Sequence, residues 1–197
     1  MSHRVISGSA KGKRLKLVPG NTTRPITDRA KEALFNIIGS DIYDAYWLDL
    51  FAGTGAVGIE ALSRGAEFVL FNDMERLAIT TIEDNLKTTG LAANAKIMRK
   101  DAFALLAAPP DEVYDFIYVA PPQYKGIWKD VLLRLEEKPI WIPAGTEVIV
   151  QIDPREHEDV KLKHLELADE RRYGSTMLCF YVSEYDPEDA TPGSTQD

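Results

Sequence analysis

The segment from Trp47 to Gly58, WLDLFAGTGAVG, constrains the fold more than any other part of the chain. Its apolar start predicts a buried strand, and the residues from Ala56 on predict a helix. Between them, the spacing Gly53-x-Gly55-x-x-Gly58 lets the backbone turn tightly and approach a ligand, while the start of the helix offers free N–H groups. This combination is typical of a nucleoside- or nucleotide-binding α/β protein. The alternative is a turn that only packs a helix on a sheet.

A carboxylate supports the binding interpretation. Asp73 follows a second apolar run and lies about 20 residues beyond Gly53, where dinucleotide-binding folds have the acidic residue that holds a ribose. A carboxylate can accept hydrogen bonds from both ribose hydroxyls at once. The alternative role for Asp73 is to cap the helix that we expect to begin near Glu75.

Strands and helices alternate through the middle of the chain. Strand-like runs occupy residues 47–51, 68–72, 96–99, 114–119 and 147–152, and helical runs occupy 56–64, 75–88, 102–107 and 127–136. An earlier helix is expected between its N-cap, Thr27 or Asp28, and its stop at Gly39. Repeated units of this kind imply an α/β fold with a mostly parallel sheet and helices on both faces.

The last two strand-like runs break this alternation. Residues 162–167 and 177–185 are separated by 168–176, a connection too short for a helical crossover. We therefore expect a seven-stranded sheet with an antiparallel terminal hairpin at its edge. A parallel sheet that ends in this way resembles the Rossmann-like methyltransferases.

The charge of the chain is unevenly distributed. Although the net charge is −8, the first 31 residues hold eight basic side chains and one acidic one, against 15 basic and 30 acidic side chains in the remainder. A basic segment on an acidic body indicates a nucleic-acid-binding arm. The alternative is a solvated basic tail without a partner. The candidate RNA-binding residues are Arg4, Lys11, Lys13, Arg14, Lys16, Arg24 and Arg29.

These patterns divide the chain into three parts. Residues 4–6 and 14–18 alternate apolar and basic side chains around a glycine-containing loop, which predicts a hairpin arm over residues 1–22. Two strands alone are marginally stable in water, so the arm must pack against the main domain or a ligand. The main domain is expected over residues 23–185, and the acidic residues 186–197 are expected to form a disordered tail.

Several kinds of site and location are disfavoured. No apolar run approaches the roughly 20 residues of a membrane span, and the basic N-terminus lacks the apolar core of a signal peptide. The single cysteine, Cys179, fits a reducing cytoplasm. His3, His157 and His164 show no zinc-ligand spacing, so we expect no metal. We also expect a monomer.

Side chains near the carboxyl ends of the predicted strands are the candidates for ligand binding, because ligands of doubly wound sheets bind at that edge. A carboxylate at Asp49, inside a buried strand, should meet N–H donors of the following turn and also a charged ligand group such as an ammonium. Asp101 could accept the exocyclic amine of an adenine or cap the short helix after it. The cofactor-binding candidates are Asp49, Phe51, Ala52, Gly53, Thr54, Gly55, Asp73, Met74, Asp101 and Ala102.

The segment after the fourth predicted strand is the strongest local signal for chemistry. Two prolines fix the backbone and leave carbonyl groups free to accept hydrogen bonds, and a neighbouring aromatic ring can stack on a base. Such a turn suits a planar exocyclic amine that attacks a methyl group. The alternative is a rigid turn that leads into the next helix. The catalytic candidates are Ala120, Pro121, Pro122, Gln123 and Tyr124.

Four segments together resemble one family. DLFAGTGAVGIEALSRGA, RVISGSAKGKRLKLV, RPITDRAKEALFNII and RRYGSTMLCFYV are similar to the bacterial 16S rRNA guanine-N2 methyltransferases of the RsmD type, and the resemblance covers residues 3–183. It implies a Rossmann-like class I methyltransferase fold and S-adenosyl-L-methionine as cofactor. It also implies methylation of the exocyclic N2 of one guanine in 16S rRNA or the assembling small ribosomal subunit, in the cytoplasm. Gly53 and Gly55 would hold the amino-acid end of the cofactor, Asp73 its ribose and Asp101 its adenine.

One departure from the family pattern affects the catalytic turn. The family has Asp-Pro-Pro followed by an aromatic residue, whereas this chain has Ala120 first and Gln123 in the aromatic position. Our hypothesis is that the carbonyls of Ala120 and Pro121, with the amide oxygen of Gln123, hold the amine, while Tyr124 stacks on the guanine. Two other functions remain open: a non-catalytic RNA-binding relative and a nicotinamide-dependent oxidoreductase.

Overall fold

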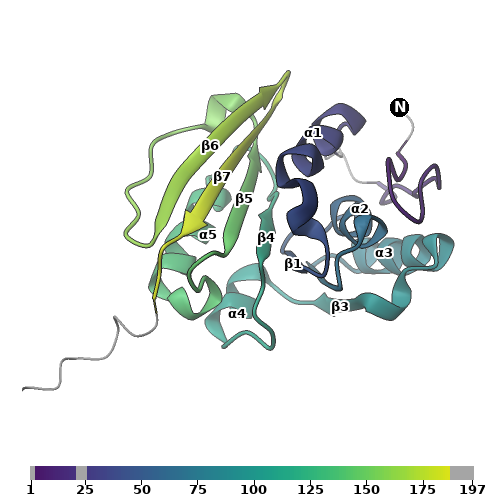
Figure 1. Cartoon of the computed structure of the whole chain (residues 1–197), viewed down its shortest axis with the longest axis horizontal. Coiled ribbons are helices and arrows are strands. Elements are labelled where there is room, and N and C mark those ends of the chain that lie inside the picture. Colours follow the sequence, from purple (N-terminus) through teal and green to yellow (C-terminus); the bar gives the residue numbers. More distant parts are fainter. Residues whose placement is uncertain (1–2, 21–25, 187–197) are drawn as a thin grey trace, which may run out of the picture.

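The computed structural model describes residues 3–20 and 26–186 and shows a mixed sheet with helices on both faces (Figure 1). The strand order is β3-β2-β1-β4-β5-β7-β6. Strands β1 to β5 pair in parallel, β7 runs antiparallel to β5, and β6 runs antiparallel to β7. This is the seven-stranded, mostly parallel sheet with a terminal hairpin that the sequence predicts. The strands are β1 Tyr46–Asp49, β2 Phe68–Asp73, β3 Ala95–Arg99, β4 Phe116–Val119, β5 Glu147–Ile152, β6 Leu165–Tyr173 and β7 Thr176–Ser183.

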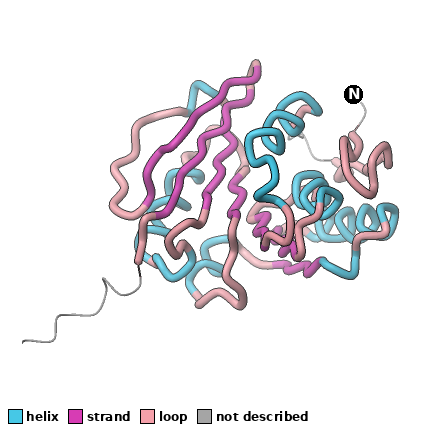
Figure 2. The backbone as a smooth tube through the Cα atoms, viewed as in Figure 1, coloured by secondary structure: helices cyan, strands magenta, loops and turns pink. Residues whose placement is uncertain are grey.

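Helices cover the sheet in two layers (Figures 1 and 2). On one face, α1, α2 and α3 pack against side chains such as Trp47 and Phe71. On the other face, α4 and α5 pack against Leu48 and Leu70. Neighbouring residues of one strand enter opposite cores because successive side chains of a strand point to opposite faces. The helices are α1 Asp28–Ile38, α2 Ala56–Arg64, α3 Arg76–Thr89, α4 Ala102–Ala107 and α5 Ile127–Glu137, with 3-10 turns η1 Gly39–Ile42, η2 Ala92–Asn94, η3 Pro139–Trp141 and η4 Pro154–Glu156.

The helix ends follow the local chemistry of the sequence. Thr27 caps α1 by accepting a hydrogen bond from the N–H of Ala30, and Gly39 ends the helix with a φ of 61°. Asp101 caps α4 in the same way, through the N–H of Ala104. The alternative that the sequence left open for Asp101 is therefore realised in the fold.

Several predicted strands extend beyond the observed ones. β6 begins at Leu165 rather than at residue 162, and β7 ends at Ser183 rather than at residue 185. β1 ends at Asp49 rather than at residue 51. Leu50 still donates its N–H to the carbonyl of Tyr118 in the neighbouring β4, and the chain then leaves the sheet for the glycine-rich loop. β4 begins at Phe116 rather than at residue 114. The N–H of the preceding residue, Asp115, bonds to the carbonyl of Tyr46.

The terminal hairpin is tighter than predicted. Most of the expected connection, residues 168–176, is in fact strand: β6 continues to Tyr173, and only Gly174 and Ser175 lie between the two strands. Gly174 has a φ of 65°, which glycine adopts at little cost. β6 is an edge strand whose central residues are mostly exposed and charged, so it lacks the apolar alternation that reveals a half-buried strand.

The N-terminal arm lacks the two regular strands that the sequence suggested. Its ends meet in one antiparallel bridge, Arg4 with Arg14. On either side of this bridge, Val5 donates its N–H to the carbonyl of Lys13 and Leu15 donates to the carbonyl of His3, so the two limbs pair as a hairpin without regular strands. Other backbone groups of the arm bond to side chains of α2 and α3, including Glu60 and Asn85. The arm therefore packs against the main domain, as the marginal stability of a lone hairpin requires. Arg24 and the predicted tail beyond residue 186 lie outside the described residues.

Among the described residues, no helix combines the length and the apolar character that crossing a bilayer requires.

Candidate active site

The candidate ligand-binding residues gather at the carboxyl edge of the parallel strands. β1 lies between β2 and β4, so Asp49 at the end of β1 is flanked by the ends of both neighbours. The N–H of Ala52 bonds to the carbonyl of Asn72 at 2.9 Å, which draws the glycine-rich loop over the end of β2. This edge next to the central strand is where α/β sheets bind ligands.

Asp49 is buried with its charge only half satisfied. Its side chain is 1% exposed, and Oδ2 accepts the N–H of Gly58 at 3.2 Å. Oδ1 is buried without a hydrogen-bond partner among the described residues. Burial raises the pKa of this carboxyl to about 7, against the lowering effect of the Gly58 hydrogen bond. An oxygen in this state calls for a cationic or N–H donor from a ligand.

The loop between β1 and α2 depends on its glycines for two different reasons. Gly53 and Gly55 have φ values of 54° and 76°, so the loop requires left-handed backbone on both sides of Thr54. Gly58 instead allows close packing, since a Cβ there would lie 2.4 Å from the ring of Phe71. The packing alternative thus describes the third glycine, whereas the first two shape the loop itself.

Asp73 fixes the glycine-rich loop and keeps capacity for a ligand. Its Oδ2 accepts the N–H of Gly53 at 2.8 Å, and its Oδ1 accepts the N–H of Glu75 at 2.9 Å. A carboxylate has about four acceptor sites, so both oxygens can still receive a ribose hydroxyl. The bond to Glu75 resembles the capping role that the sequence left open, although Glu75 itself occupies the N-cap position of α3.

The remaining cofactor-binding candidates differ in their solvent exposure. Met74 is 59% exposed beside the end of β2, and Asp101 is exposed with one carboxylate oxygen, Oδ1, engaged in its cap. Ala52 and Ala102 are buried in opposite cores. Phe51 and Thr54 are partly buried, and Phe51 packs beside the α4–α5 core. Met74 and Asp101 therefore present the accessible groups at this edge.

The proline turn after β4 is open at its tip. Ala120 is partly buried and Pro121 buried, whereas Pro122, Gln123 and Tyr124 are exposed. Tyr124 has a φ of 61°, which is uncommon for a residue with a side chain. Its N–H bonds to Oε1 of Glu156 at 2.6 Å, and its hydroxyl donates to Oδ2 of Asp153 at 2.7 Å.

The residues that hold this turn were not identified from the sequence. Asp153, Arg155 and Glu156 follow β5 and all contact Tyr124; the guanidinium of Arg155 lies 5.2 Å from the centre of its ring and bonds to its hydroxyl. Hydrogen bonds from Arg155 hold the pKa of Asp153 well below its usual range. The signal that could have found them is the charged segment DPRE directly after a predicted strand.

The candidate RNA-binding residues of the arm and of α1 are exposed, and some of them are paired. Lys13 donates to the carbonyls of Thr88 and Thr89, at the end of α3. Arg4 and Lys16 make exposed ion pairs with Asp28 and Asp84, and such pairs contribute little free energy. Lys11, Arg14 and Arg29 are exposed. The exposed ion pairs of Arg4 and Lys16 could therefore be exchanged for other partners at small cost.

The structure also brings together a group that sequence spacing does not reveal. His157, Glu170 and Cys179 offer possible metal-ligand atoms within 4.8 Å of one another, and Nε2 of His157 lies 3.2 Å from Oε2 of Glu170. Glu170 and Cys179 are paired across β6 and β7, while His157 comes from the preceding loop. Cys179 is fully buried, and this burial raises the pKa of its thiol to about 12.

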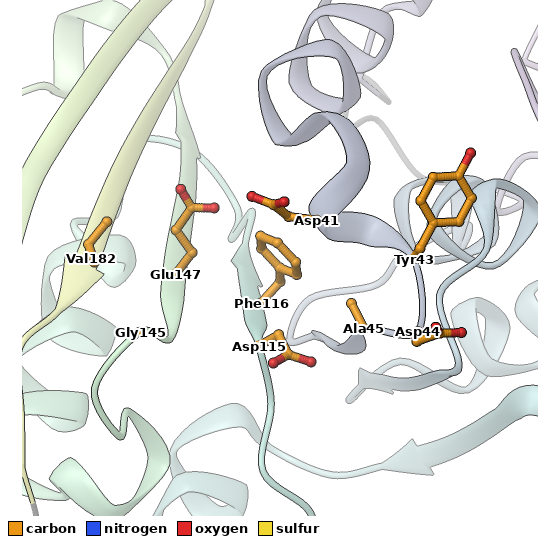
Figure 3. A pocket seen from close by; sticks show the side chains of 9 residues that line it. All are labelled: Asp41, Tyr43, Asp44, Ala45, Asp115, Phe116, Gly145, Glu147 and Val182. Atoms are coloured by element: carbon orange, nitrogen blue, oxygen red, sulfur yellow. The ribbon is translucent and has the colours of Figure 1, made fainter.

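A cavity of about 410 Å³ lies at the opposite, amino-terminal edge of the parallel strands. Asp41 from η1 and Glu147 from β5 lie on its walls (Figure 3). Burial, and then the nearby Asp41, raise the pKa of Glu147. With Asp44 and Asp115 also lining it, the cavity is acidic and unsuited to a polyanion. No candidate site residue lines it.

Comparisons with known proteins agree with this geometry. The family model described as conserved hypothetical protein 95 matches residues 3–182. The Bacillus subtilis protein YlbH is 38% identical over 180 residues, which cover 90% of this chain and 97% of that protein. Ribosomal RNA small subunit methyltransferase D of Escherichia coli is 36% identical over 134 residues, or 68% of this chain and 67% of that protein.

Solved structures give the same result. The Escherichia coli protein yhhF superposes with a TM-score of 0.81 at 30% identity and covers 93% of this chain and 99% of its own. An RNA methyltransferase from Salinibacter ruber, solved with S-adenosyl-L-homocysteine, shares the fold with a TM-score of 0.63 at 16% identity, over 86% of this chain and all of its own. The chain therefore has the class I methyltransferase fold and belongs to the conserved hypothetical protein 95 family, that of the RsmD-type rRNA methyltransferases.

Proposed function

We propose that this protein transfers a methyl group from S-adenosyl-L-methionine to the exocyclic N2 of a guanine in small-subunit ribosomal RNA. Family membership supports an S-adenosylmethionine-dependent rRNA methyltransferase, and the resemblance of the arm and of the terminal segment RRYGSTMLCFYV to the guanine-N2 enzymes supports the choice of atom. The observation that carries the proposal is Asp49, a buried carboxylate with one unpaired oxygen at the centre of the site edge.

The residues of this edge fit the chemical groups of the cofactor. Asp49 would pair with the ammonium of its amino-acid end, beside the backbone of Gly53 and Gly55. Asp73 would accept the two ribose hydroxyls, and Asp101 the exocyclic amine of the adenine through its second oxygen. When bound, the cofactor supplies a sulfonium-activated methyl group. The protein contributes position: it aligns the attacking amine with that methyl group, and no covalent enzyme intermediate is needed.

The proline turn would hold the target amine without the carboxylate that the family has at its first position. The carbonyls of Ala120 and Pro121 and the amide oxygen of Gln123 are the proposed acceptors. Tyr124 has 59% of its surface exposed and offers a ring for stacking on the guanine. Glu156 bonds to the backbone of this turn, and its Oε2 is buried without a partner among the described residues. Glu156 therefore acts as a positioning group for the turn.

Variants of the turn test this scheme. Gln123→Ala should lower kcat, since one acceptor of the amine is lost, while leaving affinity for S-adenosylhomocysteine unchanged. Methylation at the wild-type rate would exclude Gln123 from the scheme. Ala120→Asp restores the family carboxylate and is the matched comparison. If it abolishes activity, the pocket is specialised around alanine.

The RNA would be held by the basic arm and presented with its target base unstacked. Binding that depends on phosphate contacts weakens steeply with salt. A variant lacking residues 1–20 should therefore lose RNA affinity and have a shallower salt dependence. An unchanged affinity and slope would exclude the arm as the RNA contact. The monomeric state, the absence of a metal and the cytoplasmic location remain predictions.

The experiment for the proposed function is methyl transfer in vitro. Purified protein, cofactor with a deuterated methyl group and unmodified small-subunit RNA or 30S particles are incubated, and the RNA is digested to nucleosides for mass spectrometry. Labelled N2-methylguanosine is the expected product. Label in another nucleoside would refute the atom assignment, and no label with either substrate would favour the non-catalytic relative. Stabilisation by NADH but not by S-adenosylhomocysteine in a thermal-shift assay would favour the oxidoreductase.

A further inference from the structure

The side chain of Asn85 joins the N-terminal arm to the glycine-rich loop. Asn85 lies on α3 and is fully buried. Its Oδ1 accepts the N–H of Lys16 at 2.7 Å, and its Nδ2 donates to the carbonyl of Lys16 at 3.1 Å. The same Nδ2 donates to the carbonyl of Thr54 at 2.9 Å. One amide thus bonds both the end of the arm and the loop.

A second contact reaches the same loop residue from the beginning of the arm. Nε2 of His3 lies 2.8 Å from Oγ1 of Thr54. Burial, and then the positive charge of Lys31, lower the pKa of His3 to about 4, so its imidazole is neutral near pH 7. Thr54 is therefore bonded at both of its polar groups. Its side chain contacts His3 at the beginning of the arm, and its carbonyl accepts from Asn85, which also bonds Lys16 at the end of the arm.

The arm has separate attachments to the main domain that do not involve Thr54. Glu60 on α2 accepts the N–H groups of Ile6 and Ser7 at 2.8 and 2.9 Å. Ser63, one turn later, accepts the N–H of Ala10 and donates to the carbonyl of Ser7. These bonds keep the middle of the arm on α2. They also provide a control, because a substitution can remove them without altering any contact of the glycine-rich loop.

The loop is of a kind that benefits from such support. Thr54 stands between Gly53 and Gly55, and a glycine loses more conformational freedom on ordering than any other residue. Groups that hold the loop in its binding conformation reduce the entropy that a ligand must remove when it binds. Conversely, a ligand that orders the loop strengthens the contacts from Thr54 to the arm.

We propose that Asn85 and His3 are positioning residues that couple the arm to the cofactor loop, so that arm docking and cofactor binding stabilise each other. The inference rests on the proposed function for the identity of the ligand in the loop. Its consequence is that substrate RNA, by engaging the arm, changes cofactor affinity, and bound cofactor changes RNA affinity by the same factor.

Calorimetric titration with S-adenosylhomocysteine tests the coupling. Asn85→Asp keeps the acceptor for Lys16 but removes both N–H donors, and His3→Ala removes the second contact from a less buried position. Each should weaken affinity by about fivefold or more. Ser63→Ala, the control, should bind like the wild type. Melting curves establish whether each variant is folded. If Asn85→Asp does not fold, the coupling is tested with His3→Ala alone.

Hydrogen exchange supplies an independent measurement. In the wild type, S-adenosylhomocysteine should slow exchange of the Lys16 amide, which is not among the proposed cofactor contacts and is joined to the loop through Asn85, and His3→Ala should reduce that protection. Wild-type affinity in both Asn85→Asp and His3→Ala, or an equal loss in Ser63→Ala, would overturn the coupling while leaving the proposed function intact. A wild-type protein that binds no S-adenosylhomocysteine would overturn both.

Discussion

Replacing Asp49 with asparagine should make the free protein more stable while removing its affinity for the cofactor. In the structure this carboxyl is fully buried, and its pKa is raised from 3.8 to about 7. A carboxyl with a raised pKa in the folded state destabilises the fold once it ionises. Stability is therefore greatest below the unfolded pKa and falls as the pH rises through the range up to about 7. Asparagine has nearly the same shape, accepts the Gly58 hydrogen bond and does not ionise.

The size of this destabilisation follows from the shift in the pKa of Asp49. A difference of about 3 pKa units corresponds to about 4 kcal/mol at full ionisation. Between pH 5 and pH 8 this contribution to the free energy of unfolding changes by about 2–3 kcal/mol. It is less than the full amount because at pH 5 the carboxyl is already largely ionised in the unfolded chain. For a protein of this length, the advantage of Asp49→Asn in melting temperature should grow by roughly 5–10 °C over that range.

The assay is urea unfolding of wild type and Asp49→Asn, freed of ligand, at pH 5, 6, 7 and 8. Because all other titrating groups are shared, their contributions cancel in the difference between the two proteins. A difference in unfolding free energy that stays constant over this range would refute the reasoning about Asp49. Calorimetry with S-adenosylhomocysteine on the same samples should show the affinity lost in the variant. Wild-type affinity would exclude the ammonium contact.

Three further perturbations address packing, anchoring of the arm and RNA binding. Gly58→Ala should cost about 1–3 kcal/mol, because its Cβ would lie 2.4 Å from the ring of Phe71; an unchanged melting temperature would contradict this packing. Lys31→Met leaves the buried Glu60 without one partner and should cost about 3 kcal/mol by urea unfolding; a loss below about 1 kcal/mol would mean that Arg64 compensates. Lys11→Ala should weaken RNA binding and reduce the salt slope by about 0.7–0.9; an unchanged slope would exclude a phosphate contact.

Features with a local cause could be predicted from the sequence. The strand–turn–helix unit around Gly53, the cap at Thr27 and the order of strands and helices all depend on residues close together in the chain. The gathering of Asp49, Asp73 and the proline turn at one edge also followed, because parallel strands end at the same edge. The errors concern strand ends, β6, whose exposed polar residues hide its alternation, and the arm, which has one bridge in place of two regular strands.

Features that depend on distant partners could not be predicted. Asn85 reads in the sequence as an ordinary polar residue of a helix, and only folding brings it to Lys16 and Thr54. In the same way, nothing local links Tyr124 to Asp153 and Glu156. The limbs of the arm do pair with each other, but the sequence does not reveal that side chains of α2 and α3 also supply partners for its backbone.

The measurement that tests the central claim most directly is the number and position of methyl groups transferred to unmodified 30S particles by wild type and by Asp49→Asn, compared in parallel. We expect the wild type to add one methyl group per particle, at the N2 of a single guanine located by mass spectrometry of RNA fragments. The folded variant should add none. Transfer to another atom, or equal transfer by the variant, would contradict the proposed site.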